Sequence, residues 1–169
     1  MATGRKHEWR GKDALSSVLT AAFTLLLDRV SKGWASGPAL KEPAQAIPGV
    51  LGWRYVQNTG AAFSAFRNAG AFLWIPTALI IAAALYWLVR NPDCGGWMRT
   101  GVTLLIAGGL GNLYDRVAYG YVIDFIEVLF VRFAIFNVAD IAVVCGVGCM
   151  VIGILRGKGD GHEPVSRRS

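Results

Sequence analysis

Two carboxylates stand where an apolar chain has little reason to place them. Asp140 lies near the start of an apolar run from Phe133 to Leu155, with Asn137 one helical turn before it, and Asp124 lies upstream. An ionised carboxylate in or near hydrocarbon is costly unless it is paired or faces water, so such residues indicate function. Asp124 and Asp140 have no cation close in sequence.

Two carboxylates in one partly dry site do not both ionise easily, so one keeps a proton while the other can act as a general base. Aspartic peptidases use such a pair: the base takes a proton from water and the acid polarises the scissile carbonyl. His7 and His162 lie in opposite tails. A Ser-His or Cys-His nucleophile is therefore excluded.

A second group of polar residues precedes this pair. Gly108, Asn112 and Asp115 follow one another at helical spacing and form one stripe, with Arg116 next to Asp115. Each polar residue also has a structural interpretation. Asp115 and Arg116 could form an ion pair, and Asn137 could cap the last helix, because Asn is a favoured N-cap residue.

The cysteines and the glycines of GGLG at 108–111 have structural interpretations as well. Cys145 and Cys149 lie in the last apolar run, and Cys94 lies in a polar loop. They are interpreted as small apolar packing residues; no His or further Cys is near to complete a metal site, so no metal is expected. The glycines are predicted to permit close helix packing, since the Lys and Ser/Thr of a phosphate-binding loop are missing.

The composition is that of a membrane protein. Of the 169 residues 54% are hydrophobic and 17% charged, and mean hydropathy is +0.43. The net charge of +6 resides in basic residues of the tails and one short loop, which argues against a nucleic-acid partner. The chain is therefore predicted to be one integral membrane domain, 1–169, with a cytoplasmic tail at 156–169. Four apolar segments are predicted to cross the membrane: 14–34, 69–89, 98–116 and 134–155.

The first segment has an alternative interpretation. It follows a basic region, as the apolar part of a cleaved signal peptide does. DRVSK at 28–32 argues against cleavage, because charges replace the small neutral residues expected there. A continuing helix places Asp28 and Lys32 at i,i+4, interpreted as an exposed or snorkelling pair at the membrane surface or as a functional pair.

The basic residues set the orientation. Both tails and the loop at Arg90–Arg99 carry them, so by the positive-inside rule these parts are predicted to be cytoplasmic. Lys32–Asn68 and Asp115–Arg132 then lie outside. Alternation within 50–66 predicts short strands with glycine turns. Apolar residues near a helical period within 121–133 predict an amphipathic helix lying on the surface.

Five ordered motifs resemble those of bacterial lipoprotein signal peptidase, also called signal peptidase II. They are DRVSK at 28–32, NTGAAFS at 58–64, GGLGNLYDR at 108–116, VIDF at 122–125 and FNVADIAV at 136–143. The resemblance implies a mainly helical enzyme of the bacterial cytoplasmic (inner) membrane, with four transmembrane helices, a small extracytoplasmic β-sheet cradle and an amphipathic surface helix. It also implies cleavage of diacylglyceryl-modified prolipoproteins just before the lipidated cysteine, and inhibition by globomycin-type cyclic peptides.

The resemblance also implies residue roles. Asp124 and Asp140 are the expected catalytic pair, near the extracytoplasmic face. Residues expected to bind substrate or support the site are Asn58, Gly60, Asn112, Arg116 and Asn137. Residues expected to be structural or supporting are Asp28, Lys32, Gly108 and Asp115. The short apolar residues Ala61, Ala62 and Phe63 are expected to help cover the substrate, although packing alone would explain them equally well. No cofactor is expected.

Two other functions fit some of the same residues. A transporter or channel subunit could relay protons or cations through Asp28, Asp115, Asp124 and Asp140. Such a relay would distribute carboxylates across the membrane, whereas these gather toward one side. A non-catalytic assembly factor is the third alternative. Release of the signal peptide from a lipid-modified prolipoprotein would separate all three.

The orientation can be tested by single-cysteine labelling in a cysteine-free background. Cysteines placed at Glu42 and Glu127 should react with an impermeant reagent from outside the cell, and cysteines in either tail should not. Labelling of position 42 from the cytoplasmic side alone would contradict the topology.

Overall fold

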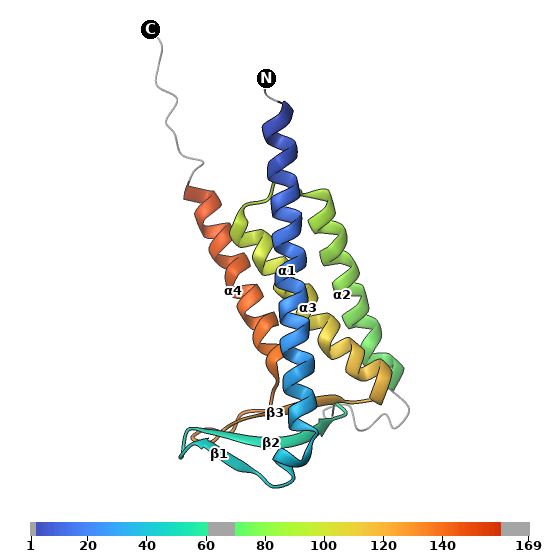
Figure 1. The fold of residues 1–169 in the computed structure, drawn as a ribbon, viewed down its shortest axis with the longest axis vertical. Coiled ribbons are helices and arrows are strands. Elements are labelled where there is room, and N and C mark those ends of the chain that lie inside the picture. The colour runs from blue at the N-terminus through green and yellow to red at the C-terminus, as the bar shows by residue number, and fades with distance from the viewer. Residues whose placement is uncertain (1–2, 61–69, 160–169) are drawn as a thin grey trace.

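The computed structural model describes residues 3–60 and 70–159. In chain order the elements are α1 (Thr3–Ala35), the short 3-10 helix η1 (Pro38–Leu40), β1 (Ala44–Ile47), β2 (Leu51–Asn58), α2 (Gly70–Arg90), α3 (Gly96–Tyr119), β3 (Val122–Val128) and α4 (Val138–Gly159). The helices form a bundle, and the sheet lies across one end of it (Figure 1). The start of α1 and the end of α4 lie at the opposite end.

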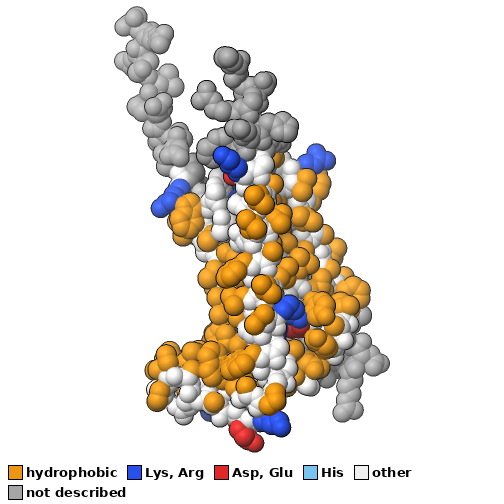
Figure 2. Space-filling view, in the orientation of Figure 1, with side chains coloured by type: hydrophobic (Ala, Val, Ile, Leu, Met, Phe, Trp, Pro, Cys, Tyr) orange, Lys and Arg blue, Asp and Glu red, His pale blue; other side chains and the backbone are white. Residues whose placement is uncertain are grey.

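The outer surface of the bundle is apolar. Side chains such as Phe23, Leu79 and Val144 are about two-thirds exposed, at 67%, 65% and 70%. Figure 2 shows hydrophobic side chains over the face of the bundle that it presents. Within the described residues, α1 and α4 contain windows long and apolar enough to cross a membrane, at Gly11–Ala35 and Val138–Arg156, and α2 contains a shorter apolar stretch, Trp74–Arg90. This surface suits a lipid environment.

Helix α3 packs against α1, α2 and α4. Glycines make the close approach of α3 to α4 possible. A Cβ on Gly101 would lie 2.6 Å from the carbonyl oxygen of Gly146, and a Cβ on Gly108 would overlap the carbonyl oxygen of Ala139. On the other sides of α3, Gly109 faces Ile81 of α2 and Gly111 faces Asp28 of α1, whose Oδ2 would be 2.7 Å from an added Cβ. The packing role predicted for the glycines is thus confirmed.

The sheet has the order β1-β2-β3 and is antiparallel. The strand predicted within 50–66 is confirmed as β2, and residues 61–69, with Ala61, Ala62 and Phe63, lie outside the described part. In the β2–β3 ladder Val56 is opposite Asp124 and Asn58 is opposite Val122. The ladder therefore brings Asn58 beside Asp124.

The amphipathic helix predicted within 121–133 is wrong. Helix α3 ends at Tyr119 and is capped by Gly120, whose φ of +81° favours glycine, and the chain then enters β3. Residues Val122–Ile126 are all buried, because β2 pairs with the strand on one side and Phe136 bridges Ile126 on the other. Burial of consecutive positions, with β-branched residues, produced an apolar pattern that resembled a helical period.

Substitution of Gly146 tests the packing of α3 on α4. Gly146→Leu should lower the free energy of unfolding by about 1–3 kcal/mol or more, because the side chain must push the two backbones apart. Gly148→Leu is the matched control, since a Cβ there meets no atom within 4 Å. Thermal unfolding in one detergent gives the comparison, and equal melting temperatures for the two variants would contradict the packing.

Candidate active site

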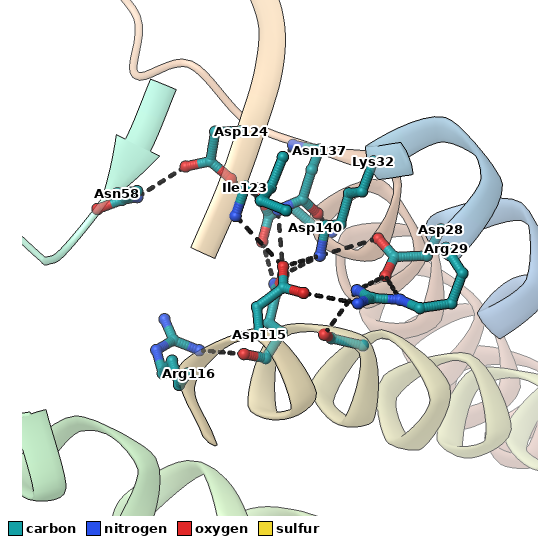
Figure 3. A network of polar contacts seen from close by, with 12 residues as sticks. Asp28, Arg29, Lys32, Asn58, Asp115, Arg116, Ile123, Asp124, Asn137 and Asp140 are labelled. Carbon is teal, nitrogen blue, oxygen red and sulfur yellow. Dashed lines mark hydrogen bonds and ion pairs between the residues drawn. The ribbon is translucent and has the colours of Figure 1, made fainter. Parts of the chain in front are cut away.

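The polar residues expected to form a site converge at the sheet end of the bundle, as Figure 3 shows. Asp124 projects from β3 and is 2% exposed, whereas Asp140 lies in the first turn of α4 and is partly buried. Helix α3 contributes Asn112, and the residue before α4 is Asn137, which is fully buried. Elements far apart in sequence thus place two carboxylates and several amides in one cluster.

Neutral donors hold both carboxylates. Asn58 Nδ2 donates to Asp124 Oδ2 at 2.7 Å, and Asn137 Nδ2 donates to Asp124 Oδ1 at 2.6 Å. Asp140 Oδ1 accepts from Asn112 Nδ2 at 2.7 Å, and its Oδ2 accepts from the backbone N–H of Asn137 at 3.1 Å. Within the described residues neither carboxylate forms an ion pair. The site therefore orients the pair without neutralising it.

Asn137 has two structural tasks. Its Oδ1 accepts from the backbone N–H of Asp140 at 3.0 Å, while Asp140 returns a bond to the N–H of Asn137. This reciprocal arrangement is a capping box, so the predicted N-cap is confirmed. Because the same Asn137 side chain also bonds Asp124, the start of α4 fixes the position of one carboxylate relative to the other.

Burial raises the pKa of Asp124. The hydrogen bonds from Asn58 and Asn137 oppose this rise, and the nearby charge of Asp140 adds to it. Asp124 is therefore protonated more readily than an ordinary exposed aspartate is. This is the arrangement in which one carboxyl of a pair keeps a proton.

A cluster of four charged residues lies behind the pair. Lys32 Nζ contacts Asp28 Oδ1 at 3.0 Å, Asp115 Oδ2 at 2.8 Å and Asn112 Oδ1 at 2.9 Å. The first two contacts are ion pairs, and in the third Lys32 donates a hydrogen bond to the Asn112 amide oxygen. Arg29 bonds both Asp28 and Asp115, so two cations balance two carboxylates. We call these four residues the charged cluster.

The expected exposed or snorkelling pair at Asp28 and Lys32 is wrong, although the two residues do pair. Each is only 1% exposed. Their side chains lie between α1 and α3, where Gly111 leaves space for the Asp28 carboxylate. Charges buried at this depth need partners on both helices, which the cluster supplies.

The expected ion pair between Asp115 and Arg116 is also wrong. Adjacent residues on a helix do not face each other. Asp115 instead meets Arg29 and Lys32 and accepts from the backbone N–H of Ile123 at 3.2 Å, which ties α3 to β3. Arg116 Nη1 lies 3.4 Å from the carbonyl oxygen of Asn112.

Asn112 connects the charged cluster to the carboxylate pair. Its Oδ1 accepts from Lys32 Nζ and from Asn137 Nδ2, at 2.9 and 3.0 Å. Two donors at the oxygen fix the orientation of the amide, so Nδ2 faces Asp140. Lys32 therefore determines the direction of a donor to Asp140 without touching that residue.

Beside the pair is a cavity of about 470 Å³. Asn58, Asp124 and Asp140 form its polar edge, and its other lining residues are Phe133, Ala134, Ile135, Phe136, Ile141, Val144 and Cys145. Cys145 is exposed and lines this cavity, so its interpretation as a packing residue is wrong. A polar edge on an apolar wall suits a peptide segment with apolar side chains.

Gly60 supports the site through its backbone. Its N–H donates to Asn58 Oδ1 at 2.9 Å, and its φ of +74° is a conformation that favours glycine. The turn fixes the Asn58 amide so that Nδ2 faces Asp124. No group of three or more His, Cys, Asp and Glu side chains that could hold a metal was found within the described residues.

Arg29 is the residue of this region that sequence reasoning missed. Its contacts with Asp115 and with the carbonyl oxygen of Gly111 cross from α1 to α3. The helical spacing that relates Asp28 to Lys32 gives no equivalent signal for Arg29. Only its position in the charged DRVSK segment pointed to it.

The fold and the site define a helical membrane protein with a paired-carboxylate site at one end. Comparisons with known proteins place it further: the signal peptidase (SPase) II family profile matches residues 20–156. The chain is 41% identical over 138 residues to a lipoprotein signal peptidase of Streptococcus thermophilus (strain CNRZ 1066), covering 81% of this chain and 90% of the relative. It is 43% identical over 136 residues to that of Streptococcus pyogenes serotype M5 (strain Manfredo), covering 80% and 90%.

Two solved structures have the same fold. A bacterial membrane enzyme determined by the in meso method at 2.3 Å superposes with a TM-score of 0.78 and 30% identity, covering 90% of this chain and 94% of that one. A second bacterial membrane enzyme, determined by the same method at 1.9 Å, superposes with a TM-score of 0.77 and 33% identity, covering 83% of this chain and 93% of that one. The chain belongs to the signal peptidase II family. This membership favours a membrane peptidase over the transporter and the assembly factor.

Removal of the Lys32 charge should destabilise the protein. Lys32→Met leaves two buried carboxylates with one cation, a change that costs about 3–5 kcal/mol when a buried pair is broken. Lys41→Met is the matched control, because Lys41 is exposed. Unfolding in one detergent measures both, and a Lys32→Met melting temperature equal to that of the control would contradict the structural role.

Proposed function

We propose that Asp124 and Asp140 are the catalytic dyad of an aspartic endopeptidase. The observation that carries this proposal is their shared environment: two neighbouring carboxylates, each held by neutral donors, at the polar edge of an apolar cavity. Family membership supports a peptidase that cleaves signal peptides of lipoprotein precursors. The proposed substrate is a diacylglyceryl-modified prolipoprotein, cut immediately before its lipidated cysteine.

The raised pKa of Asp124 supports assigning the resting proton to that residue. Asp140 then takes a proton from a water molecule as the water oxygen attacks the scissile carbonyl carbon. Asp124 donates a hydrogen bond to the carbonyl oxygen, where negative charge develops. When the tetrahedral intermediate collapses, the C–N bond breaks and the cysteine nitrogen receives a proton from the dyad. The products are the carboxylate of the signal peptide and the amine of the lipidated cysteine.

The neutral amides suit this chemistry. A cation in contact with either carboxylate would lower its pKa and weaken the base or remove the acid. Asn58, Asn112 and Asn137 orient the carboxylate oxygens while leaving their charge available. Lys32 acts one bond further away, through Asn112.

The apolar cavity wall supports a substrate held at membrane depth. The last residues of a lipoprotein signal peptide enter from the bilayer, and the diacylglyceryl group of the cysteine keeps the next residue there. Ile141, Val144 and Cys145 provide an apolar surface directly beyond Asp140. Cyclic peptide inhibitors of the globomycin type are expected to occupy the same cavity, and membrane lipid is a further partner.

The proposed topology has four membrane crossings, with both tails cytoplasmic. Helices α1 and α4 have the length and apolarity of spans, and α2, with its shorter apolar stretch, and α3 complete the bundle. The sheet and the dyad would then lie near the extracytoplasmic face of the bacterial cytoplasmic membrane. Basic residues lie near the end of the bundle opposite the sheet, which accords with this placement.

Substitution of three aspartates discriminates between catalytic and structural roles. Asp124→Asn and Asp140→Asn keep the shape but cannot exchange a proton, so turnover should fall by about 10³-fold or more. Their folded yield should hardly change or should rise. Asp115→Asn should instead lower thermal stability, because it removes a charge that partners Arg29 and Lys32, while cleavage per folded molecule stays appreciable.

The comparison uses purified, folded variants, one lipid-modified substrate and one detergent for melting temperatures. Asp93→Asn, a substitution in an exposed loop, is the control for both turnover and melting temperature. Near-normal turnover of Asp124→Asn, together with a folded but inactive Asp115→Asn, would make Asp115 the second member of the dyad.

Cleavage should be independent of metal ions. The proposed site supplies carboxylates and amides and lacks a His or Cys set of the kind that holds a transition metal. Turnover before and after treatment with a chelator should be equal. A loss of activity that added zinc specifically restores would refute the dyad mechanism.

A further inference from the structure

A second cavity, of about 450 Å³, lies at the same end of the bundle. Ile123 lines it, whereas Asp124 lines the cavity of the proposed active site. Successive residues of a strand point to opposite faces, so β3 separates the two cavities. The second one is therefore not an extension of the peptide-binding cavity.

Tyrosines dominate the walls of this second cavity. Tyr114 and Tyr119 come from α3, Tyr121 follows it, and Tyr55 comes from β2. The ring centroids of Tyr114 and Tyr119 are 6.1 Å apart, and those of Tyr119 and Tyr121 are 6.0 Å apart. The four phenol groups, two of them from α3, thus border one space, and their hydroxyls interact in the pairs Tyr114–Tyr119 and Tyr55–Tyr121. In each pair only one hydroxyl hydrogen is used between the two rings, so the other can be donated to a ligand.

The charge that this cavity presents is positive. Arg29 and Lys32 are its charged lining residues, and the Arg29 side chain is 30% exposed. The carboxylates of Asp28 and Asp115 are buried, at 1% and 0%. Arg29 also lies over the Tyr114 ring, 4.7 Å from its centroid. The counter-charges are thus shielded from the cavity, and the guanidinium is not.

Arg29 has a donor to spare. Its contacts are Nε to Asp28, Nη1 to Asp115, and Nη2 to Asp28 and to the Gly111 carbonyl. A guanidinium has five N–H donors, so one Nη1 hydrogen has no partner among the described residues. Lys32, by contrast, is buried; it forms ion pairs with Asp28 and Asp115 and donates to Asn112.

We propose that this cavity binds the phosphate group of a membrane phospholipid, with Arg29 as its charge partner and the tyrosine hydroxyls as further donors. An Arg beside hydroxyl donors matches the geometry and charge of a phosphodiester. The lining residues come from α1 and α3 and from the strands β2 and β3, so the cavity lies where the apolar bundle meets the sheet. Tyrosines at such a level face lipid headgroups. This cavity is distinct from the one that Asp124 and Asp140 border.

Two substitutions test the cavity without removing Arg29 from the charged cluster. A Cβ on Gly33 meets no atom within 4 Å, so Gly33→Leu places a side chain in the cavity; Gly148→Leu, equally open, is its control on α4. Tyr119→Phe removes one hydroxyl and keeps the ring. Tyr86→Phe is its control, because Tyr86 also contacts an arginine, Arg90, but does not line this cavity.

The experiment is isothermal titration of the full-length protein, purified free of phospholipid, with dihexanoyl phosphatidylglycerol below its micellar concentration. Dihexanoylglycerol and inorganic phosphate are titrated separately. One phosphatidylglycerol should bind, and more tightly than either of the others. Gly33→Leu should weaken it about tenfold or more, and Tyr119→Phe about fivefold, the equivalent of one neutral hydrogen bond. Both controls should match the unmodified protein.

Dihexanoylglycerol binding as tightly as phosphatidylglycerol would overturn the phosphate site. Inorganic phosphate binding as tightly would overturn the lipid assignment. Unchanged affinity in a folded Gly33→Leu, or in Tyr119→Phe if the first variant does not fold, would overturn the location. The experiment measures binding and not cleavage. A failure of the proposed lipid site is therefore distinguishable from a failure of the proposed peptidase activity.

Discussion

The buried ammonium group of Lys32 is the constraint on which the site depends. A charge that is 1% exposed between apolar helices is stable only with compensation, and Asp28 and Asp115 provide it from α1 and α3. Glycine at position 111 is what lets the Asp28 carboxylate lie against α3. Helix packing and charge pairing therefore require each other, and together they fix the sheet end of the bundle.

The third contact of Lys32 extends this order to the carboxylate pair. Asn112 Oδ1 is held by Lys32 and Asn137, so the amide presents a donor to Asp140, while Asn137 presents one to Asp124. Charges are balanced within the charged cluster and left unbalanced at the pair. Neutral amides between the two regions transmit orientation without neutralising the carboxylates, which is the condition for one to hold a proton and the other to accept one.

The spacing of residues within one segment predicted the features that depend on that segment's own geometry. The i,i+4 pairing of Asp28 with Lys32, the cap at Asn137, the β2 strand and the role of the glycines on α3 could all be read from neighbouring residues. Contacts between distant segments could not: the partners of Asp115 come from α1, more than 80 residues away. The same limit applies to β3, whose burial depends on β2 and Phe136, and to Arg29, whose role appears only when α1 packs on α3.

Strand β3 divides the sheet end into two chemically different sides. Asp124 faces the cavity that the carboxylate pair borders, and the adjacent Ile123 faces the one that Arg29 and the tyrosines line. The backbone N–H of Ile123 bonds Asp115, so the strand that carries Asp124 is attached to the charged cluster. A displacement of α1 would then move both Arg29 and, through Asp115 and β3, Asp124. A ligand held by Arg29 would restrict that displacement and so favour a single geometry of the carboxylate pair.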